Sequence, residues 1–194
     1  MQRSWRIGTD KLTFIICAPL TPPTSSLSAH SSCILAGQDD NGDAMLGDIN
    51  LFLSEHHVTT EEFSPDRGHA GKKKLVGEIE VMIARKEQQG KGYGRAAVLL
   101  FLWYVVVCRE DLVAAHCVDE DVEGVLTHLR VKIHQGNHRS IALFESLLFK
   151  KACEAPNYFG EYELVLEDLD VVRMYGLMKM YGLGECRTLK YSWE

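Results

Sequence analysis

The sequence predicts an α/β (α+β) fold in which a mixed, mostly antiparallel sheet is flanked by helices. Short apolar runs rich in β-branched residues alternate along the chain with segments of helical periodicity. Their order is three strands, a helix, a strand, a helix and a strand. The chain has 194 residues, of which 46% are hydrophobic and 25% charged, which is the composition of one ordinary globular domain.

The predicted strands are apolar or alternating segments that end at turn residues. They lie at 12–20, 44–54, 75–84, 125–133 and 157–167. In the last of them, alternation places Tyr158 and Tyr162 on one face. The segment 21–43 is rich in Ser, Thr, Pro, Gly and Asp, which is typical of a loop. We expect the second and third strands to form a hairpin around a polar, mobile insertion at 56–74.

The predicted helices differ in character. Residues 92–108 are almost continuously apolar, which predicts a buried helix. Asn137 begins NHRSIALFESLLFKKA, in which apolar residues recur at helical spacing and Asn is a favourable N-cap. A third helical run, LDVVRMYGLMKMYG, belongs to a C-terminal extension at 168–194, so the main domain is expected at 1–167.

Charge and cysteine content limit the classes of partner. The net charge of −6 argues against nucleic acid as the main partner. The longest apolar run (96–108) is shorter than the roughly 20 residues needed to cross a bilayer, so no membrane partner is expected. The six cysteines show no CxxC and no metal-ligand spacing. We therefore expect reduced thiols, no metal, and a cytoplasmic or nuclear protein.

The segment QQGKGYG (88–94) lies between a predicted strand and a predicted helix. A helix N-terminus presents unpaired N–H groups and a partial positive charge, and glycines let the backbone approach a phosphate closely. An ordinary turn of this kind usually requires one glycine, whereas this one has three. The pattern predicts phosphate binding by the glycines and the donors around them, namely Gln89, Gly90, Lys91, Gly92, Gly94 and Arg95.

Two nucleotide-binding motifs fit this turn less well. The P-loop pattern GxxxxGK[ST] is absent from the sequence. Residues 92–97 fit GxGxxA, the pattern of a dinucleotide-binding oxidoreductase. However, five polar residues (85–89) separate the glycines from the preceding strand, and an antiparallel hairpin precedes them instead of a parallel unit. The oxidoreductase is therefore the less favoured alternative.

Two segments resemble the signatures of GNAT acetyltransferases. QGKGYG (89–94) resembles [QR]xxGx[GA], which holds the pyrophosphate of acetyl-CoA, and KIHQGNHRSIALFESLLF (132–149) resembles the second signature. With LGDINLFL, GEIEVMIA and the stretch at 4–15, they look similar to the N-acetyltransferase 9-like family over residues 4–167. This family normally has one strand and two helices before the segment that opens here with Met1, and their loss would expose apolar sheet surface.

The resemblance implies a GNAT-like fold with acetyl-CoA as cosubstrate and no metal. Backbone amides of residues 89–95, Tyr93 included, would hold the pyrophosphate. The strand edge at Met82, Ile83 and Ala84 would pair with the pantetheine arm as an added strand does. Asn137 would face the arm or the acetyl group.

Acetyl transfer to an amine requires a group that accepts the amine proton. Glu78 and Glu80 lie on one face of a predicted strand, where two like charges raise the pKa of at least one carboxyl. The position of Glu78, eleven residues before Gln89, resembles that of the catalytic Glu in histone-acetylating GNAT enzymes. Glu78 is the first candidate for the general base and Glu80 the second, against the simpler interpretation of a solvated strand face.

The resemblance implies an acetyl-CoA-dependent N-acetyltransferase that acetylates a protein or peptide amine, with the N-terminus of tubulin as the family's proposed acceptor. The residues themselves do not point to tubulin. Many GNAT enzymes protonate the leaving thiolate with a Tyr where this chain has Phe144. The CoA thiolate would then leave unprotonated or take its proton from water. A non-catalytic GNAT remnant that binds CoA or a partner is the alternative from another class.

Overall fold

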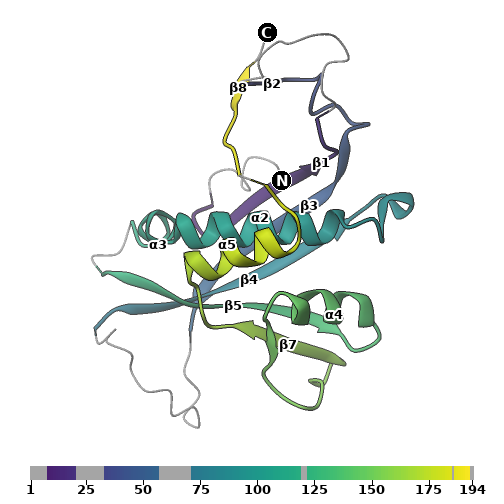
Figure 1. Ribbon diagram of the computed structural model, residues 1–194. Helices are drawn as coiled ribbons and strands as arrows, with labels where there is room; N and C mark the ends of the chain where they lie inside the picture. Colours follow the sequence, from purple (N-terminus) through teal and green to yellow (C-terminus); the bar gives the residue numbers. More distant parts are fainter. Residues whose placement is uncertain (1–7, 21–32, 57–70, 119–121, 185, 193–194) are drawn as a thin grey trace.

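The computed structural model describes residues 8–20, 33–56, 71–118, 122–184 and 186–192. A six-stranded sheet has the order β1-β3-β4-β5-β7-β6, and β2 and β8 form a separate pair (Figure 1). The strands are β1 (Lys11–Cys17), β2 (Cys33–Leu35), β3 (Met45–Glu55), β4 (Lys73–Ile83), β5 (Gly124–His134), β6 (Lys150–Lys151), β7 (Glu161–Leu166) and β8 (Lys190–Ser192). The helices are the 3-10 helix η1 (Lys86–Gln88), α2 (Tyr93–Val107), α3 (Arg109–His116), α4 (His138–Ser146) and α5 (Val171–Met180). The predicted mixed, mostly antiparallel sheet with flanking helices is confirmed.

The predicted hairpin is formed by β3 and β4, which are antiparallel with Gly47 opposite Ile83. Within the insertion predicted between them, residues 57–70 lie outside the described part of the chain. β4 and β5 are parallel. Parallel neighbours need a crossover connection, which α2 and α3 supply. The C-terminal ends of β4 and β5 therefore lie at the same edge of the sheet.

β4 and β5 separate toward this edge. Their pairing ends where Glu78 lies opposite Arg130. Beyond that point, within the described residues, β4 pairs with β3 as far as Ile83. β5 pairs with β7 as far as His134. The two backbones therefore diverge, and we call the region between them the split.

One face of the sheet packs against the helices. Val98, Leu102 and Val105 of α2 are fully buried, and Leu51 and Leu129 of the sheet are part of the same core. α5 lies beside α2 across this face (Figure 1). Its buried residues in this core are Met174, Leu177 and Met178. The C-terminal extension thus contributes to the core that the main domain forms.

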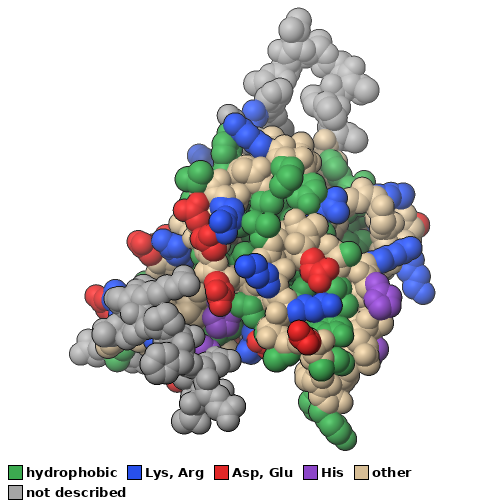
Figure 2. Space-filling view, turned by 60° about the horizontal axis from the view of Figure 1, so that its bottom comes forward, with side chains coloured by type: hydrophobic (Ala, Val, Ile, Leu, Met, Phe, Trp, Pro, Cys, Tyr) green, Lys and Arg blue, Asp and Glu red, His purple; other side chains and the backbone are tan. Residues whose placement is uncertain are grey.

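The opposite face of the sheet carries several polar side chains around the split. Its side chains alternate with the core residues along each strand. They include Asn50, Glu78, Glu80, Arg130, Lys132 and Glu163. Met82 and Ile15 are exposed apolar residues on this face. Phe52, opposite Glu78, and Val165, opposite Arg130, also lie on this face, so it combines polar and apolar side chains. Outside the grey atoms, Figure 2 likewise shows acidic and basic side chains interspersed over the visible surface.

The strand predicted at 157–167 begins later, at Glu161. Asn157 Oδ1 accepts hydrogen bonds from the N–H groups of Phe159 (2.9 Å) and Glu161 (3.0 Å), and Gly160 has a φ of 76°. These features form a turn before the strand. Tyr158 lies on that turn and is 96% exposed, so the predicted common face of Tyr158 and Tyr162 is wrong.

Several other elements were absent from the sequence-based prediction. α3 follows α2 through Cys108, and because only its Val113 is buried, no apolar periodicity marks it. β6, with two residues, and β2 and β8, with three each, are too short to carry a periodic signal.

Two further observations concern the cysteines and the expected lack of a membrane partner. All six cysteines are free thiols; Cys117 alone is buried, and Cys153 is exposed. Among the helices of the described residues, none has both the length and the apolar character needed to cross a membrane.

Candidate functional site

The segment between β4 and α2 contains two glycines with left-handed backbone. Gly90 has a φ of 74° and Gly92 a φ of 92°. A Cβ at either position would find no atom within 4 Å. Conformation, and not lack of space, therefore favours glycine at these two positions.

Gly94 differs from the other two because it has an ordinary helical backbone in the first turn of α2. A Cβ there would lie 3.8 Å from Ile83 Cγ1, which is an ordinary van der Waals contact. The fold itself therefore does not require glycine at position 94. Close approach of a ligand to the backbone would provide a reason for it.

The N-terminal N–H groups of α2 are not neutralised by side chains. The N-cap is Gly92, no side-chain cap is present, and the first turn contains no acidic residue. The N–H groups of Tyr93, Gly94 and Arg95 therefore lack intrahelical acceptors. Lys91 is exposed in the preceding turn. These groups suit an anion such as a phosphate.

The end of β4 presents one edge to the split. The Ala84 N–H donates to Leu46 O on the β3 side (2.8 Å). Because backbone groups alternate between the two edges of a strand, those of Ile83 point toward the split and those of Met82 toward β3. Ile83 O accepts a hydrogen bond from Gln89 Nε2 (2.8 Å), which ties the turn to the strand end. Of the three residues predicted to meet the pantetheine arm, Ile83 therefore directs its main chain toward the split.

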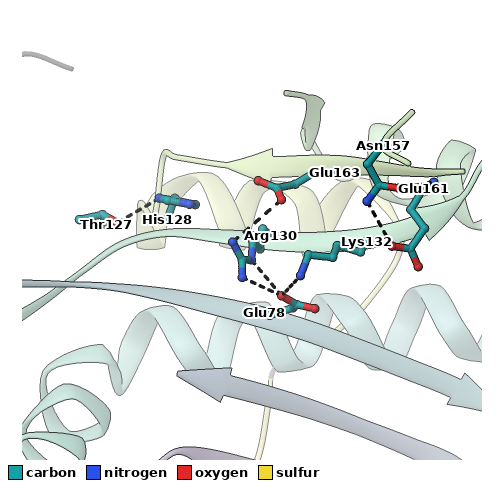
Figure 3. A network of polar contacts seen from close by, with 8 residues as sticks. All are labelled: Glu78, Thr127, His128, Arg130, Lys132, Asn157, Glu161 and Glu163. Atoms are coloured by element: carbon teal, nitrogen blue, oxygen red, sulfur yellow. Dashed lines mark hydrogen bonds and ion pairs between the residues drawn. The ribbon is translucent and has the colours of Figure 1, made fainter. Parts of the chain in front are cut away.

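Glu78 lies at the apex of the split and is held by two cations. Its Oε2 accepts hydrogen bonds from Arg130 Nε (2.9 Å), and Arg130 Nη2 and Lys132 Nζ each lie 2.9 Å from the same oxygen. Arg130 Nη1 also lies 3.9 Å from Glu163 Oε2. Figure 3 shows these side chains of β4, β5 and β7 pointing toward one another. The Glu78 side chain is 20% exposed, so this ion-pair cluster is partly shielded from water.

Glu80 shares the face of Glu78 but has a different environment. It is exposed, and within the described residues it forms no ion pair or side-chain hydrogen bond. It lies opposite Asn50 in the β3–β4 register. Asn50 is buried and donates from Nδ2 to Asp48 Oδ2 (2.7 Å), while Thr13 Oγ1 donates to Asn50 Oδ1 (2.7 Å). Glu80 is therefore free to contact an incoming group.

Asn137 is the predicted N-cap of α4. Its Oδ1 accepts a hydrogen bond from the Ser140 N–H (3.2 Å), and its own N–H donates to His134 O (2.8 Å). α4 thus begins directly after β5, at the sheet edge where α2 follows β4. Phe144, which stands where many GNAT enzymes have Tyr, is buried in the core against Phe149.

Arg130 and Lys132 were not among the predicted site residues. Alternation in the strand predicted at 125–133 places both on one face, so the sequence contains a signal for their orientation. Their contact with Glu78 depends on the parallel register of β4 and β5, which strand periodicity does not reveal.

Comparisons with known proteins add to this geometry. No protein-family model matches the chain. The N-acetyltransferase 9-like protein of Schizosaccharomyces pombe is 33% identical over 181 residues, covering 86% of this chain and 74% of that protein. The alpha/beta-tubulin-N-acetyltransferase 9 of Homo sapiens is 32% identical over 166 residues, covering 86% of this chain. This chain spans only 60% of the human protein's length.

A solved structure of Arabidopsis thaliana NAA60 in complex with a bisubstrate analogue is 11% identical, with a TM-score of 0.47. The alignment covers 80% of this chain and 75% of that one.

The relatives that match most of this chain are named N-acetyltransferases, so the chain is of the acyltransferase class. More narrowly, identity over most of both chains shows that this chain belongs to the N-acetyltransferase 9-like family.

Proposed function

We propose that this chain binds acetyl-CoA and transfers its acetyl group to the N-terminal amine of a protein, with tubulin as the acceptor. The observation that carries the proposal is the divergence of β4 and β5 beyond Glu78 and Arg130, next to the uncapped N-terminus of α2. The turn at 89–95 would hold the pyrophosphate. The edge of β4 would hold the pantetheine arm in the split, with the thioester toward the apex.

The chemistry requires a neutral amine, an electrophilic thioester and a proton acceptor. The amine nitrogen attacks the thioester carbonyl carbon, and the resulting oxyanion accepts a hydrogen bond from a main-chain N–H of β4 that faces the split. By strand alternation, Ile83 and Val81 carry such groups. The carbon–sulfur bond then breaks, CoA leaves as its thiolate, and the proton lost by the amine passes to a carboxylate.

Glu78 is the proposed proton acceptor, and Glu80 is the second candidate. Glu78 lies where the two strands part, and Arg130 and Lys132 fix its Oε2. Glu80 lies two residues nearer the open end of the split and is exposed. A water molecule would supply the proton for the thiolate, since Phe144 has no acidic group.

The tubulin acceptor rests on the names of relatives. Those from Homo sapiens, Drosophila melanogaster and Mus musculus are called alpha/beta-tubulin-N-acetyltransferase 9. The polar face around Glu80, Asp48 and Asn50 carries acidic groups that suit a cationic amine before it loses its proton.

A second function, CoA binding without catalysis, is favoured by one observation. Both ion pairs of Glu78 fall on the same oxygen, as in a structural ion-pair cluster. The two functions separate in an acetyl-transfer assay with peptides that bear the N-terminal sequences of α- and β-tubulin. We expect acetylation of free N-termini and none of the same peptides with a formylated N-terminus. Binding of acetyl-CoA without transfer to any free amine would support the non-catalytic function.

A further inference from the structure

The first turn of α2 contacts the C-terminal part of the chain through one aromatic residue. Arg95 Cζ lies 4.6 Å from the centre of the Tyr181 ring. A guanidinium over an aromatic face at this distance makes a cation–π contact, which is worth more when the partners are partly shielded from water. Arg95 is exposed and Tyr181 is half-buried.

Tyr181 itself is fixed on two sides. It is the C-cap of α5, its N–H donates to Leu177 O (3.1 Å), and Gly182, with a φ of 70°, follows it in the left-handed conformation that ends many helices. Its hydroxyl donates to Ser146 O at the end of α4 (3.1 Å). The ring therefore lies at a junction of α2, α4 and α5.

α5 holds this junction in place because it is anchored in the core. Met174, Leu177 and Met178 are each at most 4% exposed. The closing turn adds a hydrogen bond from the Leu183 N–H to Met178 O (2.9 Å). The Tyr181 ring is thus held in a fixed position under the Arg95 guanidinium.

The contact leaves the hydrogen-bonding capacity of Arg95 available. A ring under the guanidinium covers its face, whereas its N–H groups point outward in the plane. Within the described residues Arg95 forms no ion pair with a carboxylate. An unneutralised, pre-positioned guanidinium next to an uncapped helix N-terminus is suited to a phosphate, which it can bind through two parallel hydrogen bonds.

We propose that Tyr181 is a positioning residue for the cofactor: it holds Arg95 to bind a phosphate group of acetyl-CoA. This inference rests on the proposed function and adds the C-terminal extension to the cofactor site. The phosphate is either the pyrophosphate or the 3′-phosphate of the ribose, which present the same chemistry to a guanidinium. Tyr181 acts through Arg95 and does not touch the ligand.

The test is a double-mutant cycle read by calorimetric titration of the full chain with acetyl-CoA. We expect Tyr181→Leu and Arg95→Ala each to weaken binding, with Tyr181→Leu costing roughly three- to fivefold, the range of an exposed cation–π contact. In the Arg95→Ala background, Tyr181→Leu should have no further effect. Tyr181→Phe keeps the ring but loses the hydrogen bond to Ser146 O, so it should weaken binding less than Tyr181→Leu does.

Two additional arms make the result decisive. 3′-Dephospho-acetyl-CoA lacks the 3′-phosphate and so distinguishes the two phosphates. If Arg95→Ala weakens the binding of both ligands equally, Arg95 binds the pyrophosphate. If it weakens the binding of acetyl-CoA alone, Arg95 binds the 3′-phosphate. Tyr181→Met, which fills a similar volume without a π face, replaces Tyr181→Leu should that variant fail to fold.

An unchanged dissociation constant in folded Tyr181→Leu would overturn the inference. The inference would also be overturned if Tyr181→Leu lowered the affinity for acetyl-CoA equally in the unmodified chain and in the Arg95→Ala background. That result would show that the ring affects binding through the stability of the fold and not through Arg95. Failure of the unmodified chain to bind acetyl-CoA would instead overturn the proposed function, and this inference with it.

Discussion

Glu78 and Arg130 face each other at the last position where β4 and β5 pair, and the Arg130 Nε–H donates to Glu78 Oε2 at 2.9 Å. Lys132 Nζ reaches the same oxygen at 2.9 Å from further along β5. Two side chains of β5 therefore hold the Glu78 carboxylate of β4 at the point where the two strands diverge.

Glu78→Gln should lower both stability and activity. The change preserves shape but removes the charge that Arg130 and Lys132 share, so we expect the free energy of unfolding to fall by about 1 kcal/mol. If Glu78 is the general base, the rate of acetyl transfer should fall by roughly a hundredfold or more. Urea unfolding and a peptide acetylation assay measure the two effects.

Glu80→Gln is the matched control for that substitution. Because Glu80 is exposed and forms no ion pair among the described residues, its substitution should change stability by less than about 0.5 kcal/mol. A full rate in Glu78→Gln together with a large loss in Glu80→Gln would reverse the two proposed roles.

Gly94→Asp should weaken cofactor binding without unfolding the chain. The helical backbone and the ordinary 3.8 Å contact with Ile83 Cγ1 accommodate a side chain, and a carboxylate near a helix N-terminus stabilises the helix. The same charge would repel a phosphate, so we expect acetyl-CoA affinity to fall by about tenfold or more.

Gly176→Asp controls for the added charge in the Gly94→Asp experiment. Gly176 lies in α5, and a Cβ there would find nothing within 4 Å. Its affinity for acetyl-CoA should match that of the unmodified chain. Equal losses in both variants would show that no phosphate lies on the turn.

Gly92→Ala should destabilise the chain even without a ligand. With a φ of 92°, position 92 strains any residue that has a Cβ, at a cost of about 1–2 kcal/mol. Gly92→Asn should cost less, since Asn tolerates the left-handed region better than Ala. Denaturant midpoints measured without ligand test this order, and equal midpoints for Ala, Asn and the unmodified chain would contradict the turn conformation.

The thiols should differ in reactivity with pH. Burial, with a smaller contribution from the Asp40 charge, raises the pKa of the Cys17 thiol above its ordinary value of 9.0. The folded chain thus favours the protonated thiol, and this contribution to stability is complete below pH 9.0 and is lost as pH rises through the folded-state pKa.

A thiol reagent at pH 8 should therefore modify exposed Cys153 well before Cys17. Mass spectrometry of peptides from partly labelled protein gives the order, and Cys153→Ser removes the fast phase. Equal rates at the two positions would contradict the partial burial and the raised pKa of the Cys17 thiol.

The sequence predicts the parts of the fold that carry strong local signals. Alternation and turn residues reveal the β3–β4 hairpin, continuous apolar character reveals α2, and Asn137 marks the start of α4. α3 escapes prediction because it buries little, and β2 and β8 because their pairing joins distant segments.

The contacts in the candidate site are less predictable from the sequence than the strands and helices are, because they depend on tertiary structure. The glycine pattern marks the turn, but the left-handed conformation of Gly92 and the helical one of Gly94 become distinct only in three dimensions. Likewise, the register that brings Arg130 to Glu78, and the docking of α5 that brings Tyr181 to Arg95, depend on long-range packing.

The most direct test of the central claim is calorimetric titration of the purified chain with acetyl-CoA, with NADH as the control ligand. If the turn and the split form a CoA site, acetyl-CoA should bind with a dissociation constant on the order of 1 μM and NADH should not bind. A folded chain that binds neither ligand, or binds NADH alone, would contradict the account.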